Sequence, residues 1–459
     1  MGTNRLVMLT SINKLNIMKK RNVNVYIKGG IIMKLEKERL TIATPEEQRT
    51  KWFDIAFIWF CANVAVPRLM IGGQLIEMGF WSMLAMITIG NCIIFIPLLA
   101  LGDIGYKVKI PTMAATRFTF GIKGSYLPSI ANGVQLLGWA ANVTVICGSS
   151  IDAIISNMTG YSNLMLWIII TAIAQLIITA YGFRSITWLQ RVSVPLLLLL
   201  SIVTVVIVFK GYGFNVISSY TPVAPIGIMI GVDILAANAF AWGPMVCDYT
   251  RYAKSGAGAG VGTLVGSLVG AASFMFVGGI SFIATGSANP VDFLLTQGLG
   301  IPALLIIILS SVTTNVVNLY SSGISFVNVF SKVEPWKIIV PLGVVVGLIA
   351  IIPNLIGHFI TFLIIVGAIF VPLIGIMLVD FYIIKKKSVD VRQVLVEDSS
   401  SKYWFNNGFN WSALCVWFAG IIIYNLFSHV CPAVGACVPT LILVCVIYYI
   451  VGKSKNKEV

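Results

Sequence analysis

The sequence predicts an all-α polytopic membrane protein with twelve transmembrane helices, ten in two inverted repeats of five and two peripheral. Three observations predict this class. Of the 459 residues, 58% are hydrophobic and only 10% are charged, whereas soluble domains carry roughly 25% charged residues. About twelve stretches have the mostly apolar length of about 20 residues that crosses a bilayer. Two of these stretches, five spans apart, contain proline and polar residues near their middle.

The predicted spans follow one another with short polar breaks. Spans 1–5 lie within residues 52–209 and form the first repeat, and spans 6–10 lie within 224–392 and form the second. Because each repeat has an odd number of spans, the second enters the membrane in the opposite orientation. Spans 11 and 12, within 411–452, are peripheral. In order, the spans are 53–79, 81–101, 125–156, 163–183, 188–209, 224–247, 261–285, 302–330, 337–353, 355–383, 411–428 and 434–452.

Positive charge alternates with the loops between these spans. Apart from Lys210 and Arg68, every Lys and Arg lies in the N-terminal tail (1–51), in the C-terminal tail (453–459) or in an even-numbered loop. Cytoplasmic loops carry such an excess. We therefore expect both termini in the cytoplasm and the chain in a bacterial cytoplasmic (inner) membrane. The net charge of +14 then reports topology and requires no nucleic-acid partner.

The first 32 residues differ from the rest. They are polar and basic without helical periodicity, and Lys28-Gly29-Gly30 is compatible with a ribosome-binding sequence just before Met33. We expect Met33 to begin the native chain and residues 1–32 to be upstream translation.

Residues that hold metals or perform covalent catalysis are sparse. The eight cysteines are scattered without ligand spacing, and the two histidines are His358 and His429. Neither histidine is near a candidate nucleophile or an acidic ligand pair in the sequence. The sequence therefore predicts no enzyme and no cofactor.

Spans 1 and 6 are interrupted at their middle. Span 1 contains Pro67 and Arg68 within residues 63–68, and span 6 contains Gly243-Pro244 at the end of residues 238–244. Proline removes a helical hydrogen bond, and backbone left unpaired at membrane depth must line a cavity or be buried in protein. Matched interruptions in two five-span repeats are typical of secondary transporters that bind their solute at the break. The alternative is that the prolines only kink ordinary helices.

Four motifs, collinear within residues 52–392, give the sequence a specific resemblance. They are Arg117–Ser129 followed by Gly138-Trp139, Asp248–Tyr252, Thr313–Gly323 and Asp380–Tyr382. Together they resemble the nucleobase:cation symporter family, in its cytosine/purine permease branch.

The resemblance implies the leucine-transporter-like fold of sodium-coupled amino-acid transporters. It also implies import, by alternating access, of cytosine, a purine, hydantoin, allantoin or a pyrimidine precursor by symport with Na+ or H+. The expected partners are this substrate, the coupling cation and membrane lipid, without an obligate protein partner.

A flat polar ring needs aromatic faces and amide groups that match its edge. In span 3, Gln135, Trp139 and Asn142 share one helix face, although the family's usual amide position is one residue after Gln135. In span 8, Asn315 and Asn318 also share a face. We expect both helix faces to line the substrate site. The alternative is that these amides bridge helices.

In span 6, the resemblance places substrate contacts at the break, where this chain has Asn238, Phe240 and Trp242. Relatives often have serine at the position of Asn238, and some have a stacking phenylalanine at that of Ala239. Stacking is therefore expected from Trp242 or Phe240 instead.

A sodium ion prefers several hard oxygen ligands. Span 8 offers the hydroxyls of Ser310, Thr313 and Thr314, and the resemblance adds backbone carbonyls of the broken first span near Asn63 and Val66. The alternative is that these hydroxyls bond back to their own helix.

Charged residues within spans are costly and have a functional role by default. Arg68 and Asp233 are predicted at similar depth, so one hypothesis pairs them across the repeats. The alternatives are that Arg68 binds a carbonyl or carboxylate of the substrate, or that it extends outward to the interface. Asp248 and Arg251, at the inner end of span 6, are expected to form a gate or a helix-end contact.

The main rival function is transport of another small organic solute, such as an amino acid, on the same fold. A tryptophan with several amides suits a ring better than a free carboxylate and ammonium. A channel is disfavoured because two helices are interrupted in mid-membrane.

Overall fold

Helices form the regular secondary structure of the described residues, which in this computed structural model are 42–45, 47–180, 183–286, 300–352, 355 and 358–455. The chain divides into two units, Met1–Lys34 and Leu35–Val459. The description below concerns the second unit by itself. The expected start at Met33, with residues 1–32 before it, lies outside the described residues.

Helices occupy each range predicted for spans 1–5. Span 1 contains α2 (Trp52–Asn63), α3 (Val66–Leu75) and the 3-10 turn η1 (Ile76–Met78), and span 2 contains α4 (Phe80–Ala85), the π-helical turn η2 (Met86–Gly90), α5 (Asn91–Ile94) and α6 (Ile96–Val108). Spans 3, 4 and 5 are α9 (Tyr126–Thr159), α10 (Leu164–Ala180) and α11 (Phe183–Tyr212). The short helices α7 (Thr112–Ala115), α8 (Arg117–Phe120) and α12 (Phe214–Ser218) lie in loops.

The same holds for spans 6–12. Span 6 contains α13 (Ile228–Phe240), η3 (Gly243–Met245) and α14 (Val246–Thr250), and spans 7, 8 and 9 are α15 (Gly256–Thr285), α17 (Gly300–Val329) and α18 (Pro335–Ala350). Span 10 is α19 (Phe359–Leu378) continued by η5 (Val379–Ile384). After the short α20 (Val391–Val394) come α21 (Trp411–Val430) and α22 (Cys437–Lys455).

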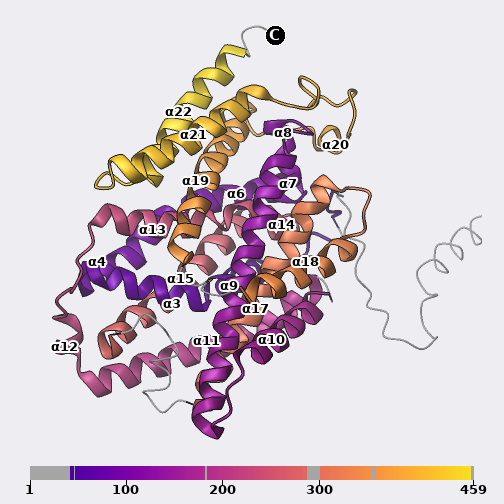
Figure 1. Ribbon diagram of the computed structural model, residues 1–459. Helices are drawn as coiled ribbons and strands as arrows, with labels where there is room; N and C mark the ends of the chain where they lie inside the picture. Colours follow the sequence, from indigo (N-terminus) through magenta and orange to yellow (C-terminus); the bar gives the residue numbers. More distant parts are fainter. Residues whose placement is uncertain are drawn as a thin grey trace, which may run out of the picture. The chain divides into compact units, whose positions relative to one another are not determined.

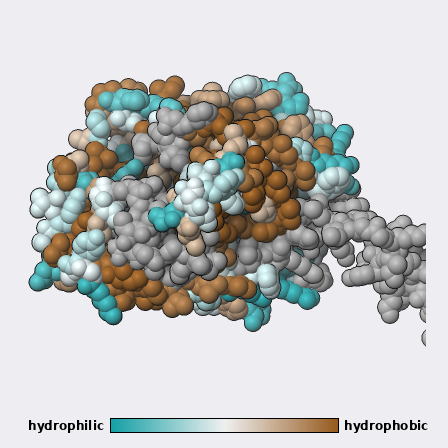
Figure 2. Space-filling view, turned by 60° about the horizontal axis from the view of Figure 1, so that its bottom comes forward, coloured by the Kyte–Doolittle hydropathy of each residue, from teal (hydrophilic) through white to brown (hydrophobic). Residues whose placement is uncertain are grey.

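Seven helices of the described residues are long and apolar enough to cross a membrane, and the bent pair in span 1 makes an eighth. Leu164–Thr179, Pro335–Ala350 and Cys437–Lys453 are shorter apolar helices. The number of twelve spans therefore stays a prediction. Broad hydrophobic areas lie on the face shown in Figure 2, and large apolar side chains such as Ile89 and Leu199 are exposed, as expected of a surface that meets lipid.

The two predicted interruptions differ in kind. Span 1 bends by 70° between its two helices, because Val64 and Ala65 leave helical geometry before Pro67 restarts the chain in the first turn of α3. Span 6 is interrupted by the turn after Phe240 and the short η3 that contains Pro244. It still counts as one span of 23 residues. The break in span 1 is confirmed, and that in span 6 is milder than expected.

Glycines of α15 hold the broken span 1 in place. A Cβ built on Gly262, Gly266 or Gly270 would collide with a carbonyl of α2, and one on Gly278 would collide with the Leu69 carbonyl of α3. Small residues at four-residue spacing let membrane helices approach closely. Both halves of span 1 are therefore packed against one continuous helix.

A second group of helices faces the breaks. In Figure 1, α9 and α17 run beside each other, and α10 and α18 pack against them. α21 and α22 lie side by side and pack against α19, which agrees with their predicted peripheral position. The residues of the candidate site come from the interrupted spans and from this second group.

Candidate substrate and cation site

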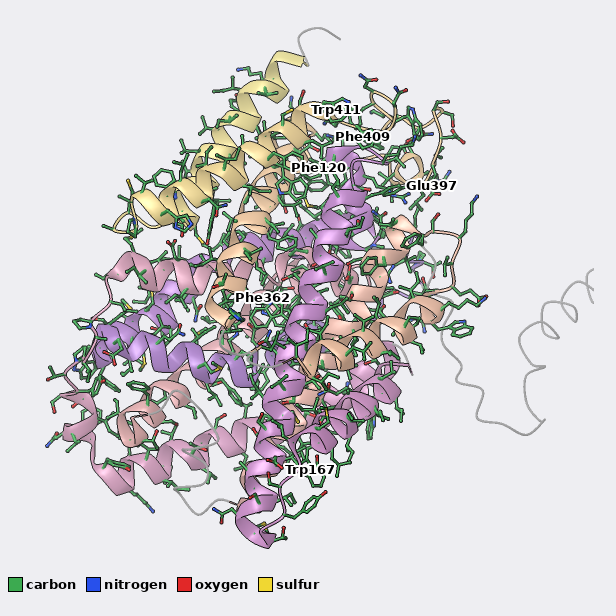
Figure 3. All side chains as sticks on the ribbon, in the orientation of Figure 1. Phe120, Trp167, Phe362, Glu397, Phe409 and Trp411 are labelled. Carbon is green, nitrogen blue, oxygen red and sulfur yellow. The ribbon has the colours of Figure 1, made fainter. Side chains whose placement is uncertain are left out.

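Aromatic side chains meet where the interrupted spans face α9 and α19. The rings of Trp139 (α9) and Trp242 (after α13) are nearly parallel, with 24° between their planes and 6.4 Å between their centroids. Phe359 and Phe362 of α19 meet Trp139 edge-on at 5.6 and 5.4 Å, and Figure 3 shows Phe362 on α19 beside α9. Trp59 of α2 meets Trp242 edge-on at 6.1 Å. We call these five residues the aromatic cluster.

Buried polar atoms without a hydrogen-bond partner accompany this cluster. Asn238 is 1% exposed, and neither its amide nitrogen nor its amide oxygen has a partner among the described residues. Among the described residues, the unpaired atoms nearby include Trp59 Nε1, Trp242 Nε1, Gln135 Oε1, Asn142 Oδ1 and Asn318 Oδ1. Buried polar groups are nearly always hydrogen-bonded, so a set of both donors and acceptors left open is suited to a polar ligand or to water.

Gln135 joins span 3 to the interruption of span 6. Its Nε2 donates to the Ala241 carbonyl at 2.8 Å and lies 2.9 Å from Asn132 Oδ1. Asn132 in turn donates to Ser325 Oγ of α17 at 2.7 Å. One end of Gln135 thus bridges helices, which was the alternative interpretation, while its Oε1 stays open.

Asn142 and Phe240, also named from the sequence, are both buried. The Asn142 side chain donates to the Gly138 carbonyl of its own helix at 2.9 Å. Phe240 is the last residue of α13, and it belongs to the hydrophobic core. Its ring does not pair with Trp139 in this structure; Trp242 does.

Asn315 serves mainly to join helices. Its Nδ2 lies within hydrogen-bond distance of the Ala140 carbonyl (2.9 Å), Thr144 Oγ1 (3.0 Å) and Gln175 Oε1 (2.7 Å), so its two amide hydrogens are engaged. The bridging alternative describes Asn315 in this conformation. Asn318 donates to Asn315 Oδ1 at 3.3 Å and keeps its own Oδ1 open.

The expected cation ligands lie where α17 passes the end of α2. Thr314 Oγ1 donates to the Cys61 carbonyl at 3.2 Å, one of the last carbonyls of a helix, which have no partner within it. Thr313 Oγ1 bonds back to the Leu309 carbonyl at 2.8 Å. Ser310 is fully buried on the same helix. The structure thus brings the Thr314 hydroxyl to the end of α2, whereas the Thr313 hydroxyl bonds back to its own helix, as the alternative has it.

The remaining expected ligands belong to the break itself. Asn63 is the last residue of α2, and Val66 is the first of α3. The Asn63 side chain donates to the Trp59 carbonyl at 2.8 Å and accepts a hydrogen bond from Arg68 Nη2.

The hypothesis that Arg68 pairs with Asp233 is wrong for this structure. Arg68 Nη2 donates to Asn63 instead, and the Asp233 carboxylate accepts hydrogen bonds from the backbone amides of Ala436 (2.6 Å) and Cys437 (2.8 Å). Similar depth in the membrane did not bring the two side chains together, because the loop before α22 supplies better partners to Asp233. The alternative that Arg68 extends outward is also wrong here, since Arg68 is 2% exposed.

The inner end of span 6 is tied to its surroundings. The Asp248 carboxylate accepts a hydrogen bond from the Thr112 amide at 2.9 Å. Arg251 Nε is 3.3 Å from the Asp248 carbonyl, and its guanidinium lies over the Tyr252 ring. The role of Asp248 and Arg251, as a gate or as a helix-end contact, stays a prediction. Tyr249 adds a contact to α17, with its hydroxyl 3.1 Å from Ser321 Oγ.

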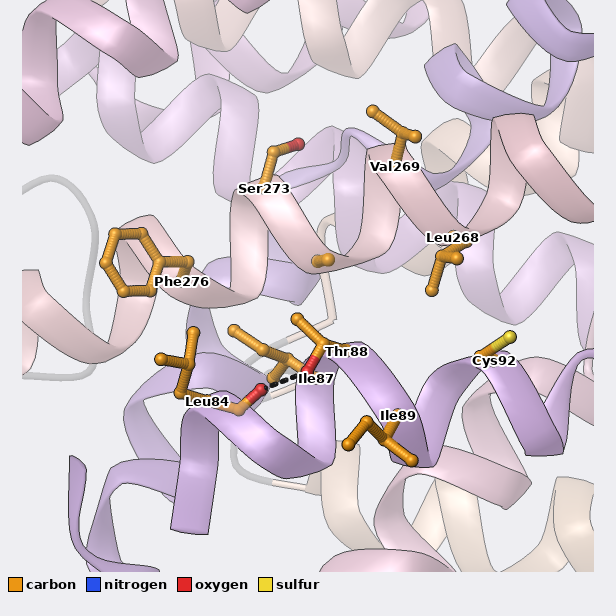
Figure 4. A pocket seen from close by; sticks show the side chains of 10 residues that line it. Leu84, Ile87, Thr88, Ile89, Cys92, Leu268, Val269, Ser273 and Phe276 are labelled. Atoms are coloured by element: carbon orange, nitrogen blue, oxygen red, sulfur yellow. Dashed lines mark hydrogen bonds between the residues drawn. The ribbon is translucent and has the colours of Figure 1, made fainter. Parts of the chain in front are cut away.

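Further hollows lie in the described part of the chain. Figure 4 shows an apolar groove of about 620 Å³ between span 2 and α15. Its hydroxyls at Thr88 and Ser273 bond to carbonyls of their own helices, so the groove offers no open polar group and is suited to lipid. A second hollow, of about 420 Å³, lies beside Asp233 and Tyr424.

Several site residues were not predicted from the sequence. Trp59 lies one helical turn before Asn63, and this spacing is a sequence signal that could have identified Trp59 as a site residue. Tyr249 lies within the motif Asp248–Tyr252, and Asn132 follows the motif Arg117–Ser129 by three residues. Gln175, on α10, had no such signal, because its role depends on a contact with Asn315.

Comparisons with known proteins agree with this architecture. A family model described as a permease for cytosine/purines, uracil, thiamine and allantoin matches residues 43–452. Hydantoin permease of Microbacterium maritypicum is 26% identical over 394 residues, covering 81% of this chain and 80% of that protein. Cytosine permease of Escherichia coli (strain K12) is 24% identical over 348 residues, covering 75% and 80%.

Two solved structures resemble this chain in fold. Mhp1, a nucleobase-cation-symport-1 family transporter in a closed conformation with bromovinylhydantoin bound, has a TM-score of 0.80 at 21% identity, covering 92% of this chain and 96% of that one. A substrate-bound, outward-open Na+-coupled sialic acid symporter has a TM-score of 0.63 at 12% identity, covering 92% and 93%. The expected leucine-transporter-like fold is confirmed. From the match over residues 43–452, the chain belongs to the family of permeases for cytosine and purines, uracil, thiamine and allantoin.

Proposed function

We propose that this permease imports a nucleobase-like heterocycle across a bacterial cytoplasmic membrane by symport with Na+ or H+, with both termini in the cytoplasm. The observation that carries the proposal is the aromatic cluster with open donors and acceptors beside it, at the interruptions of spans 1 and 6. A flat ring stacks on the indole faces, and its edge meets the open amides. The relatives named above, a hydantoin and a cytosine permease, support this class of substrate.

The coupling ion would bind where Thr314 contacts the end of α2, with Thr313 and Ser310 of the same helix as further oxygen ligands. Hydroxyl and carbonyl oxygens suit a hard cation without adding charge, and half-helix C-terminal ends coordinate such ions in transporters with interrupted helices. Thr314, already bonded to the Cys61 carbonyl, is the residue on which this site depends most.

Uptake into proteoliposomes tests the proposal. Labelled pyrimidine, purine and hydantoin rings, both neutral and acidic, are offered with an inward Na+ gradient, an inward H+ gradient or neither. We expect at least one ring to accumulate with one of the gradients and amino acids not to compete. Accumulation of an amino acid with no ring transported would refute the proposal.

A further inference from the structure

Arg68 carries a positive charge that the protein does not neutralise. It lies in the first turn of α3, at the 70° bend of span 1, and is 2% exposed. Its one side-chain partner among the described residues is the neutral amide of Asn63, and its Nη1 has no partner. A buried charge in a membrane span is costly, and such residues nearly always pair or line a functional path.

The acidic side chains near or within the spans are engaged elsewhere. Asp54 pairs with Arg191 at 2.7 Å, and Asp380 pairs with Lys385 at 2.5 Å. Asp233 accepts from the amides at the start of α22, and Asp248 accepts from Thr112. Glu77 accepts from the Ala224 amide and the Tyr220 hydroxyl. Asp103 pairs with Lys107, and Asp152 accepts from the Ser162 hydroxyl and the Asn163 amide. Among the described residues, therefore, no carboxylate balances Arg68.

Helix ends compensate Arg68 only in part. Asn63 ends α2, and a helix C-terminus is equivalent to roughly half a negative charge. Arg68 itself belongs to the first turn of α3, where the helix carries a partial positive charge. The break in span 1 thus keeps a net positive potential, and half-helix N-termini in interrupted spans face the anionic groups of transported solutes.

Arg68 is connected to the aromatic cluster through one residue. Asn63, which accepts its hydrogen bond, donates from Nδ2 to the carbonyl of Trp59 at 2.8 Å. The ring of Trp59 meets Trp242 edge-on. Asn63 therefore links the guanidinium to the backbone of Trp59, a member of the aromatic cluster.

We propose that the substrate is an anionic heterocycle, a ring with a carboxylate or an ionised ring nitrogen, and that Arg68 binds its negative group while the aromatic cluster holds the ring. This inference rests on the proposed function and narrows its substrate class. The open Nη1 offers hydrogens to an anionic oxygen or nitrogen, and hydrogen bonds between charged groups are about twice as strong as neutral ones. Arginine is suited to this contact because it stays charged when buried.

Matched ligand pairs test the proposal on the purified full-length protein. Each pair shares a ring skeleton and differs in charge: uracil and orotate, hydantoin and hydantoin-5-acetate, hypoxanthine and urate. Affinity is measured by isothermal titration calorimetry at neutral pH. We expect the anionic member of at least one pair to bind roughly thirtyfold or more tightly than the neutral one, as for a desolvated charge pair. Neutral members that bind as tightly as their anionic counterparts would overturn the inference and leave the proposed function standing.

Substitutions assign the preference to Arg68. In Arg68→Gln the charge is lost while a donor to Asn63 remains, and we expect the ratio of anionic to neutral affinity to fall to about one. Arg68→Lys keeps the charge and should keep part of the preference for the anionic ligand. Arg117→Gln is the control, because it removes another fully buried guanidinium, one bonded to Asn328 near the end of α17 and to Glu397 after α20, and should leave the ratio unchanged. An unchanged ratio in Arg68→Gln refutes the role of Arg68. If Arg68→Gln does not fold, the ratio of anionic to neutral affinity in the wild type and in Arg68→Lys still tests the role of Arg68. If no ring of any pair binds or is transported, the proposed function itself fails.

Discussion

Replacement of Trp242 tests the aromatic cluster directly. Its ring has two aromatic neighbours, Trp139 nearly parallel at 6.4 Å and Trp59 edge-on at 6.1 Å, and its Nε1 is buried without a partner. Trp242→Phe keeps an aromatic face and removes the donor, whereas Trp242→Leu removes the face as well. The two variants therefore separate stacking from hydrogen bonding.

The expected losses differ in size. A neutral hydrogen bond contributes about 0.5–1.5 kcal/mol, so Trp242→Phe should weaken ring binding by roughly two- to tenfold. Stacking of one base on an aromatic side chain contributes about 1–3 kcal/mol. Trp242→Leu should therefore weaken binding by roughly five- to 150-fold beyond any effect on the donor.

The assay is calorimetric titration of the tightest ring from the uptake panel, with thermal unfolding in detergent as a check on folding. Trp81→Leu is the matched control, because Trp81 is 60% exposed on the lipid-facing surface and should bind the ring like wild type. Wild-type affinity in a folded Trp242→Leu would refute the placement of the substrate at this cluster.

Three further substitutions probe the cation site, the helix ends and the helix packing. Thr314→Val should raise the half-saturating cation concentration by roughly tenfold or more in flux assays, because it removes one hard ligand. The control is Thr263→Val, which should not change this concentration, because the Thr263 hydroxyl bonds to its own helix. Equal effects of the two substitutions would contradict the proposed cation site. Asp233→Ala should lower thermal stability by about 0.5–2 kcal/mol, because the cap on α22 is lost. In the double variant, the effects of Asp233→Ala and Arg68→Ala on stability should add within about 0.5 kcal/mol. A larger deviation from additivity would support an ion pair between Arg68 and Asp233. Gly266→Ala should destabilise the protein by about 1–3 kcal/mol because its Cβ meets the Ala56 carbonyl, whereas Gly211→Ala, with open space around it, should not lower the melting temperature.

The sequence predicted the parts of this structure that a single helix encodes. Hydrophobic length located the helices, and Pro67 marked the bend of span 1, because both signals are local. Trp139 and Trp242 were recognised from residue type, motif and position at the break. Their near-parallel rings agree with that prediction, whereas their role in binding stays a prediction.

Contacts between helices were harder to predict. Sequence spacing gives the depth of Arg68 and Asp233 in the membrane but not the direction in which each side chain points, so it could not exclude the amides before α22 as partners of Asp233. In the same way, the sequence allows Asn315 either to line the substrate site or to bridge helices, and its contact with Gln175, far away in the sequence, depends on the packing of α10 against α17. The four-residue spacing of Gly262, Gly266 and Gly270 was a readable signal that was overlooked.

The glycine contacts of α15 limit how the permease can change conformation. Carbonyls of both α2 and α3 rest against this one helix without side chains between them, so neither half of span 1 can swing alone without parting closely fitted backbones. We therefore expect a change of access from one membrane face to the other to move spans 1 and 7 together, as one rigid body, past α9 and α17. Locking these two groups together with a cross-link should stop transport while leaving the site able to bind its ligand.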